Sequence, residues 1–121
     1  MYQSIYKADL FAAKVIIVTG GGSGIGRCTA HELASLGATV IILGRNVDKL
    51  KNVCDELTKE GYQSDYYITD IRDSNAIKET LTAILQKHGR LDGLVNNAGG
   101  QFPSSLENIS DNGWDAVIRN N

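Results

Sequence analysis

The hydrophobic positions of the chain form short continuous runs that alternate with longer periodic patterns. The continuous runs cover residues 14–19, 39–43, 64–68 and 91–96, and the first two are rich in β-branched residues. In residues 64–68, two tyrosines supply the preference for extended backbone. Runs that are apolar at successive positions are typical of strands buried on both faces of a parallel sheet, so four such strands are predicted.

Between these runs, apolar residues recur at helical spacing, which predicts a helix after each strand. Glycines at positions 37, 61 and 89 follow the first three patterns and are typical of helix ends, and Asp73 or Ser74 is a candidate N-cap. The stripes comprise Ile25, Thr29, Leu33 and Leu36; Leu50, Val53, Cys54 and Leu57; Ile77, Leu81, Ile84 and Leu85; and, from near Ser110, Trp114, Val117 and Ile118.

The elements therefore follow the order strand–helix, repeated four times. Parallel strands need crossovers, usually helices, and such crossovers are nearly always right-handed. The order predicts a doubly wound α/β fold, in which helices cover both faces of a parallel sheet. Composition agrees with a packed globular domain, because 42% of the residues are hydrophobic and 21% are charged.

The charge of the chain argues against two classes of partner. A formal net charge of −2 indicates neither a basic nucleic-acid surface nor a polybasic membrane patch. The sequence has no run of 18 apolar residues, so no membrane span is expected, and no secretory signal is expected at its start. Cys28 and Cys54 lack C-x-x-C spacing and are expected to be reduced and at least half-buried, so a cytoplasmic location is predicted, and no metal site is.

A glycine-rich turn, T-G-G-G-S-G-I-G at residues 19–26, joins the first strand to the first helix. Glycines let the backbone turn tightly, and the helix that begins near Gly24 directs its positive end at a bound phosphate. The turn lacks the G-K-S/T of a P-loop, so an ATPase or GTPase site is excluded. A purely structural turn is the alternative. The predicted phosphate contacts are Gly20, Gly21, Gly22, Ser23, Gly24, Ile25 and Gly26.

The spacing T-G-x-x-x-G-x-G resembles that of the short-chain dehydrogenase/reductase family, and three further matches follow in order. N-N-A-G occupies residues 96–99, Asp70 and Ile71 follow the third strand, and Trp114 lies seven residues before Asn121. The resemblance covers residues 9–121. It implies a Rossmann fold with three α/β/α layers, and hydride transfer between a nicotinamide cofactor and a carbonyl or activated alkene.

The end of the second strand bears on the choice between NAD and NADP. An acidic residue there would bind the ribose 2′-hydroxyl and repel a 2′-phosphate. This chain has Gly44 at that position and then Arg45, whose planar guanidinium suits a phosphate, so NADP(H) is predicted. The alternative is that Arg45 is a solvated residue at a helix start. Many NADP-preferring members of the family carry Lys or Arg where this chain has Ser23.

The resemblance also assigns the other cofactor contacts. It implies that Asp70 accepts a hydrogen bond from the adenine amino group and that Ile71 lies against adenine, although Asp70 is also a candidate helix cap. Asn97, Ala98 and Gly99 would line the cofactor along the fourth strand, and Asn96 would stabilise the centre of the sheet.

The family's catalytic residues have one match in this chain. Its Ser, its Tyr and the Lys four residues after that Tyr have no counterpart, because none of the five tyrosines has a lysine at that spacing. Asn121 matches the Asn that positions a water in the proton relay. We therefore expect the 121 residues to be the N-terminal part of one Rossmann domain, without its catalytic second half.

Two short segments indicate a branch of the family. Residues 9–11 (D-L-F) and 100–102 (G-Q-F) resemble the branch that reduces 2-enoyl- and 2,4-dienoyl-CoA thioesters with NADPH. Phe102 would then line an acyl pocket, or else anchor its loop. Reduction of a ketone or 3-ketoacyl substrate, or nucleotide binding without catalysis, are the alternatives. The family also implies a homo-oligomer, a dimer or a homotetramer.

Overall fold

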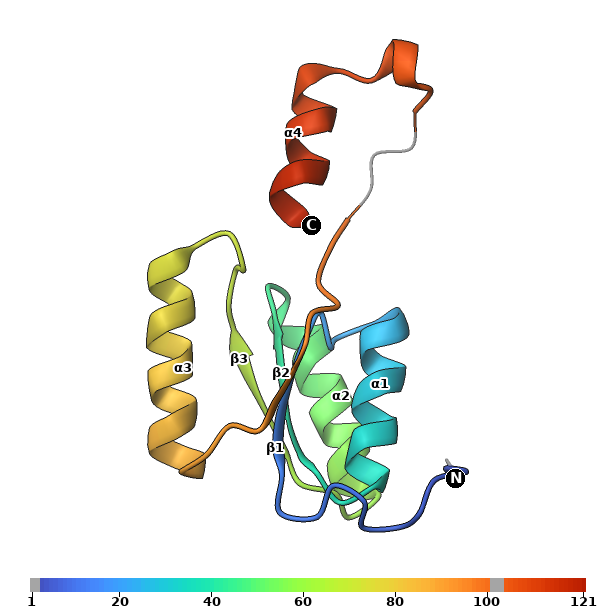
Figure 1. Ribbon diagram of the computed structural model, residues 1–121, viewed down its shortest axis with the longest axis vertical. Helices are drawn as coiled ribbons and strands as arrows, with labels where there is room; N and C mark the ends of the chain where they lie inside the picture. The colour runs from blue at the N-terminus through green and yellow to red at the C-terminus, as the bar shows by residue number, and fades with distance from the viewer. Residues whose placement is uncertain (1–2, 101–103) are drawn as a thin grey trace.

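The computed structural model describes residues 3–100 and 104–121 (Figure 1). Four strands alternate with four α-helices, as the hydrophobic pattern predicts, and a short 3-10 helix precedes the last α-helix. The elements are β1 (Val15–Thr19), α1 (Gly24–Ser35), β2 (Thr39–Gly44), α2 (Val47–Lys59), β3 (Ser64–Ile68), α3 (Ser74–His88), β4 (Gly93–Val95), η1 (Leu106–Asn108) and α4 (Asp111–Asn120).

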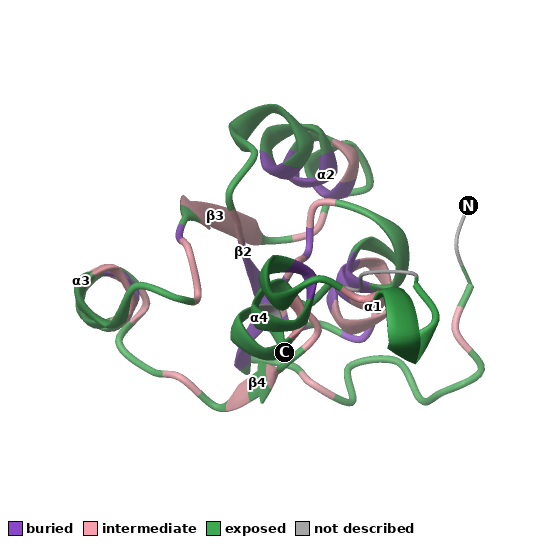
Figure 2. Ribbon diagram, turned by 90° about the horizontal axis from the view of Figure 1, so that it is seen from above, coloured by how far each residue is buried: buried purple, intermediate pink, exposed green. Residues whose placement is uncertain are grey.

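The four strands form one parallel sheet in the order β3-β2-β1-β4. The central residue of β1, Ile17, pairs with Ile41 on one side and with Leu94 on the other. Helices α1 and α2 lie on one face of the sheet and α3 lies on the other (Figure 2). This arrangement confirms the predicted doubly wound sheet and places the carboxyl ends of all four strands along one edge.

Two apolar layers fill the space between the sheet and its helices. The layer beneath α1 and α2 contains Val18, Val40 and Ile42 from the strands, and the layer beneath α3 centres on Ile17, Ile41 and Ile84. All five residues of β1 are buried, as expected for a strand covered on both faces.

The buried face of α1 differs from the predicted stripe. Its buried residues are Gly26, Ala30 and Ala34, whereas Ile25 is 79% exposed. Small side chains bring α1 close to the sheet, and the neighbouring Ile25 then points outward. The expectation for Cys28 is also wrong, since Cys28 is exposed on α1, whereas Cys54 lies on the buried face of α2.

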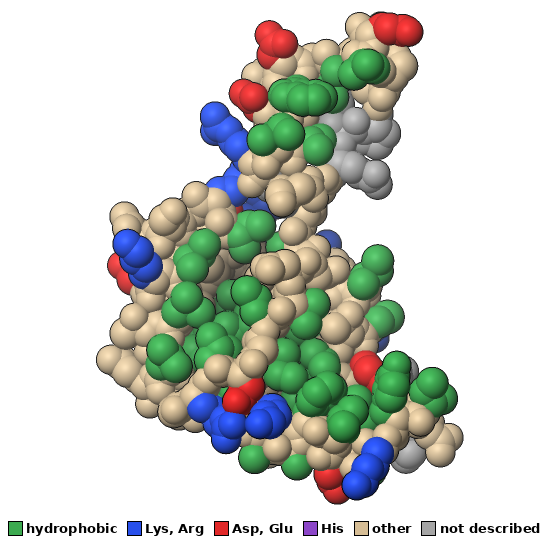
Figure 3. All heavy atoms as spheres, viewed as in Figure 1, with side chains coloured by type: hydrophobic (Ala, Val, Ile, Leu, Met, Phe, Trp, Pro, Cys, Tyr) green, Lys and Arg blue, Asp and Glu red, His purple; other side chains and the backbone are tan. Residues whose placement is uncertain are grey.

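Strand β4 is shorter than the predicted run of residues 91–96, and side chains make hydrogen bonds to the backbone beyond both of its ends. Before the strand, an Asp92 carboxylate oxygen accepts the amide hydrogen of Val15 at 2.8 Å. After it, the hydroxyl of Thr19 accepts the amide hydrogen of Asn97 at 3.0 Å. Within the described residues β4 pairs with β1 alone, and apolar side chains gather over this side of the molecule, with Leu94 56% exposed (Figure 3).

Helix α4 stands beyond the carboxyl edge of the sheet (Figure 1). It begins after Ser110, whose hydroxyl accepts the amide hydrogen of Gly113, so the predicted start is confirmed. Trp114 and Ile118 remain largely exposed on its surface. In the described part of the chain, no helix combines the length and the apolar character needed to cross a bilayer.

Candidate nucleotide-binding site

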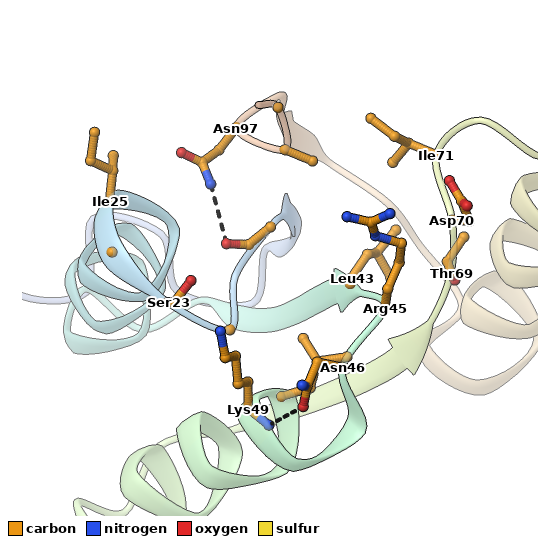
Figure 4. Close-up of a pocket in the computed structure, with 17 residues that line it drawn as sticks. Ser23, Ile25, Leu43, Arg45, Asn46, Lys49, Thr69, Asp70, Ile71 and Asn97 are labelled. Atoms are coloured by element: carbon orange, nitrogen blue, oxygen red, sulfur yellow. Dashed lines mark hydrogen bonds between the residues drawn. The ribbon is translucent and has the colours of Figure 1, made fainter. Parts of the chain in front are cut away.

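A cavity of about 460 Å³ opens at the carboxyl ends of the strands (Figure 4). Its walls come from the glycine turn, the ends of β2 and β3, the first turn of α2 and the segment after β4. The lining residues are Gly20, Gly22, Ser23, Gly24, Ile25, Leu43, Gly44, Arg45, Asn46, Lys49, Leu50, Thr69, Asp70, Ile71, Asn97, Ala98 and Gly99. In open α/β sheets this edge is where ligands bind.

The glycine turn fits tightly against its neighbours. Gly20 has a φ of 65°, and a Cβ atom there would lie 2.9 Å from Nδ2 of Asn97. A Cβ atom on Gly21 would lie 2.5 Å from Cγ2 of Ile42, and one on Gly26 would overlap the carbonyl oxygen of Gly20. Gly21 and Gly26 do not line the cavity, and the structure shows them in packing roles. Their predicted contacts with a cofactor stay a prediction.

The N-terminus of α1 has no side-chain cap. Ser23 occupies the N-cap position in an extended conformation, but its side chain makes no capping hydrogen bond, and the first turn contains no acidic residue. The other three α-helices in the described residues are capped, by Asn46, Asp73 and Ser110. Amides of the first turn of α1 therefore remain open to an anion in the cavity.

Thr19 joins the glycine turn to the segment after β4. Its hydroxyl donates to the carbonyl oxygen of Val95 at 3.2 Å and accepts the amide hydrogens of Asn97 and Ala98 at 3.0 and 2.9 Å. In return, Nδ2 of Asn97 donates to the carbonyl oxygens of Thr19 and Gly20 at 3.0 and 3.2 Å. The Asn97 side chain therefore joins the segment after β4 to the glycine turn, whereas Asn96 is exposed.

The wall of the cavity that follows β3 carries a paired carboxylate. Asp70 accepts hydrogen bonds from Nη2 of Arg72 at 2.7 Å and from the Arg72 amide at 2.9 Å. These bonds hold the pKa of the Asp70 carboxyl well below its usual range. Asp73 caps α3 by accepting the amide hydrogens of Asn75 and Ala76, so the alternative of Asp70 as the helix cap is wrong.

Most of the residues predicted to contact a cofactor meet in this one cavity. They are Gly20, Gly22, Ser23, Gly24, Ile25, Arg45, Asp70, Ile71, Asn97, Ala98 and Gly99. Sequence reasoning missed the contribution of the start of α2, where the N-cap Asn46 and Lys49 also line the cavity. The available signal was the parallel crossover itself, which places the start of every following helix at the carboxyl edge of the sheet.

Asn121 lies outside the cavity lining. Its Nδ2 donates to the carbonyl oxygens of Gly100 and Val117 at 2.5 and 2.8 Å, which ties the end of α4 to the segment after N-N-A-G. Its catalytic role therefore stays a prediction. Gln101 and Phe102, and with them the predicted acyl contact, lie outside the described residues.

The short chain dehydrogenase family model matches residues 14–121, and the chain belongs to this family. Over 105 residues the chain is 37% identical to a probable 2,4-dienoyl-CoA reductase of Bacillus subtilis (strain 168), and the match covers 87% of this chain and 41% of that protein. A 3-oxoacyl-(acyl-carrier-protein) reductase of Thermotoga maritima, FabG, is 38% identical over 108 residues, with 89% of this chain and 44% of that protein covered. The predicted resemblance to dienoyl-CoA reductases is confirmed.

Solved structures give the same fold. The citronellol catabolism dehydrogenase of Pseudomonas aeruginosa PAO1 aligns with a TM-score of 0.93 at 47% identity, over 98% of this chain and 48% of that one. A metagenomic short-chain oxidoreductase in complex with NADP aligns with a TM-score of 0.81 at 40% identity, over 89% of this chain and 49% of that one. The chain thus spans less than half the length of each of these four proteins.

Proposed function

We propose that the cavity binds NADP(H) and that the whole protein is an oxidoreductase that transfers a hydride between this cofactor and a small organic substrate. One observation carries the proposal: the uncapped N-terminus of α1 opens into a cavity that Arg45 also lines. A pyrophosphate at that end would accept the free amide hydrogens and interact favourably with the helix dipole. The residues present therefore fit the cofactor that the family uses.

The end of β2 favours NADP(H) over NAD(H). Gly44 places no carboxylate near the ribose, and Arg45 offers a charged fork of donors to a 2′-phosphate. The similar metagenomic oxidoreductase was solved with NADP, which supports the same choice. On the adenine side, Asp70 and Ile71 line the cavity together, as an amino-group acceptor and an apolar contact would need to do.

The roles of these residues are to bind and orient. When bound, NADP(H) supplies or accepts the hydride. Turn glycines and the start of α1 hold its phosphates, Thr19 and Asn97 fix the distance between the turn and the segment after β4, and Asn121 is proposed to position a water in proton transfer. The proton donor itself is not proposed among these 121 residues, because no tyrosine here has a lysine four positions later.

The proposed substrate is an enoyl thioester of coenzyme A. Similarity to the probable 2,4-dienoyl-CoA reductase supports it. Similarity at the same level to the 3-oxoacyl-(acyl-carrier-protein) reductase supports ketoacyl reduction as the second candidate. Oxidation of NADPH by the full-length protein should be faster with a crotonyl-type thioester than with a ketoacyl thioester. The reverse order would favour the second candidate, and tight NADPH binding without turnover of either would indicate a nucleotide-binding module.

Binding of NADPH and NADH to the full-length protein tests the cofactor assignment. Loss of a charge-assisted hydrogen bond costs about 1.5–3 kcal/mol, so Arg45→Gln should weaken NADPH binding by about tenfold or more and leave NADH binding nearly unchanged. Arg90→Gln is the matched control, because Arg90 pairs with Asp92 beyond the opposite end of the sheet. If the wild-type protein binds NADH as tightly as NADPH, the assignment is wrong.

A further inference from the structure

Lys49 lines the cavity on the side nearer the glycine turn. It is the third residue of α2, and its amide donates to Oδ1 of the N-cap Asn46 at 3.1 Å, which fixes its backbone at the cavity wall. Its side chain extends from α2 toward the turn that carries Ser23, whereas the guanidinium of Arg45 lies toward Asp70 (Figure 4). The two cations therefore reach the cavity on either side of Asn46.

Close contact between α2 and the glycine turn keeps Lys49 in this place. A Cβ atom on Gly22 would lie 3.1 Å from Cβ of Lys49, so glycine at this position lets the turn pass directly over the base of the lysine. Ser23 is next in the chain, and its hydroxyl makes no capping bond to α1. A donor hydroxyl and an ammonium group thus border the same corner of the cavity.

Neither Arg45 nor Lys49 makes a close ion pair among the described residues. Among the described residues, ion pairs within 4.0 Å involve Arg27, His31, Arg72, Lys87, His88 and Arg90, and neither Arg45 nor Lys49. Asp70 is the one carboxylate in the described cavity lining, and Arg72 pairs with it at 2.7 Å. The cavity wall from Arg45 to Lys49 therefore presents positive charge that no close ion pair in the described residues offsets.

We propose that Lys49 is the second cation of the 2′-phosphate site and a specificity-determining residue for NADP(H), an inference that rests on the proposed function. A phosphate monoester carries a charge of about −1.5 to −2 at neutral pH, so one guanidinium neutralises only part of it. Lys49 supplies the second positive charge, and the Ser23 hydroxyl is available as a further donor. NAD(H) has a hydroxyl at the same place, so it gains little from Lys49.

The test compares Lys49→Gln with Lys51→Gln in the full-length protein. Lys51 lies on α2 two residues further on, is exposed, and does not line the cavity, so this variant removes the same charge from the same helix. Lys49→Gln should weaken the binding of NADPH and of 2′,5′-ADP by about tenfold and leave NADH within about twofold of wild type. Lys49→Arg should retain most of the affinity, and Lys51→Gln should behave as wild type.

The outcomes separate this inference from the assignment of the cofactor. If the wild-type protein does not prefer NADPH to NADH, both the proposed NADP(H) assignment and the role of Lys49 are wrong. If the wild-type protein prefers NADPH but Lys49→Gln keeps the same NADPH-to-NADH ratio, only the role of Lys49 is overturned. An equal loss of NADPH and NADH affinity in Lys49→Gln also overturns it, because the lysine would then serve a phosphate that both dinucleotides share.

Discussion

Replacement of Thr19 by valine tests whether one hydroxyl holds the two sides of the cavity together. The side chain is 7% exposed, and valine has nearly the same shape, so the change removes three hydrogen bonds without opening a void. The amides of Asn97 and Ala98 lose their acceptor. An unsatisfied buried donor costs about 1–3 kcal/mol, and both residues are only partly buried, so Thr19→Val should lower the free energy of unfolding by about 2–3 kcal/mol.

Urea unfolding measures this loss as a lower midpoint at an unchanged slope. Thr39→Val is the matched control, because Thr39 lies in the adjacent strand β2 and its side chain makes no hydrogen bond in the described structure. The control should change the free energy of unfolding by less than about 0.5 kcal/mol. The reasoning is refuted if Thr19→Val and Thr39→Val have equal midpoints. NADPH affinity should fall with Thr19→Val even where the protein remains fully folded.

Three further predictions concern packing, pH and capping. Gly26→Ala should destabilise the protein by about 1–3 kcal/mol in urea unfolding, because the new methyl group overlaps the carbonyl oxygen of Gly20; wild-type stability would contradict the packing argument. Hydrogen bonds from Arg90 lower the pKa of Asp92 to about 2, so its stabilising contribution is complete above the ordinary pKa of Asp and is lost as the pH falls through about 2. Arg90→Gln should raise that pKa toward 3.8 in an NMR titration, and an unshifted titration would rule out the ion pair as its cause. Ser23→Ala should leave the free energy of unfolding nearly unchanged, whereas Asn46→Ala should lower it by about 1 kcal/mol; equal losses would show that Ser23 caps α1.

The order of elements and the position of the cavity follow from local signals. Continuous β-branched runs predict β1 and β2, and the predicted bounds of β3 agree with Ser64–Ile68. The glycine turn and N-N-A-G both follow strands of one parallel sheet, so sequence order alone places them at the same edge. For this reason most of the predicted cofactor residues meet in one cavity.

Other features depend on contacts between distant segments, which sequence spacing does not reveal. Alanine and glycine give a weak periodic signal, so the apolar pattern predicts a buried Ile25, whereas Gly26, Ala30 and Ala34 form the buried face of α1. Asn96 and Asn97 are identical and adjacent, and only the hydrogen bonds to Thr19 and Gly20 distinguish them. Lys49 joins the cavity because Gly22 lets the turn pass over α2, a contact between residues 27 positions apart.

The five consecutive residues from Arg45 to Lys49 are all exposed, and three of them, Arg45, Asn46 and Lys49, line the cavity beside the buried Leu43 and Leu50. Apart from the cap residue Asn46, side chains of this stretch can therefore change at the cavity wall with little penalty to folding. Under the proposed function, exchange of this stretch between related proteins, with Asn46 kept as the cap, should alter the preference between NADP and NAD without any change to the buried core.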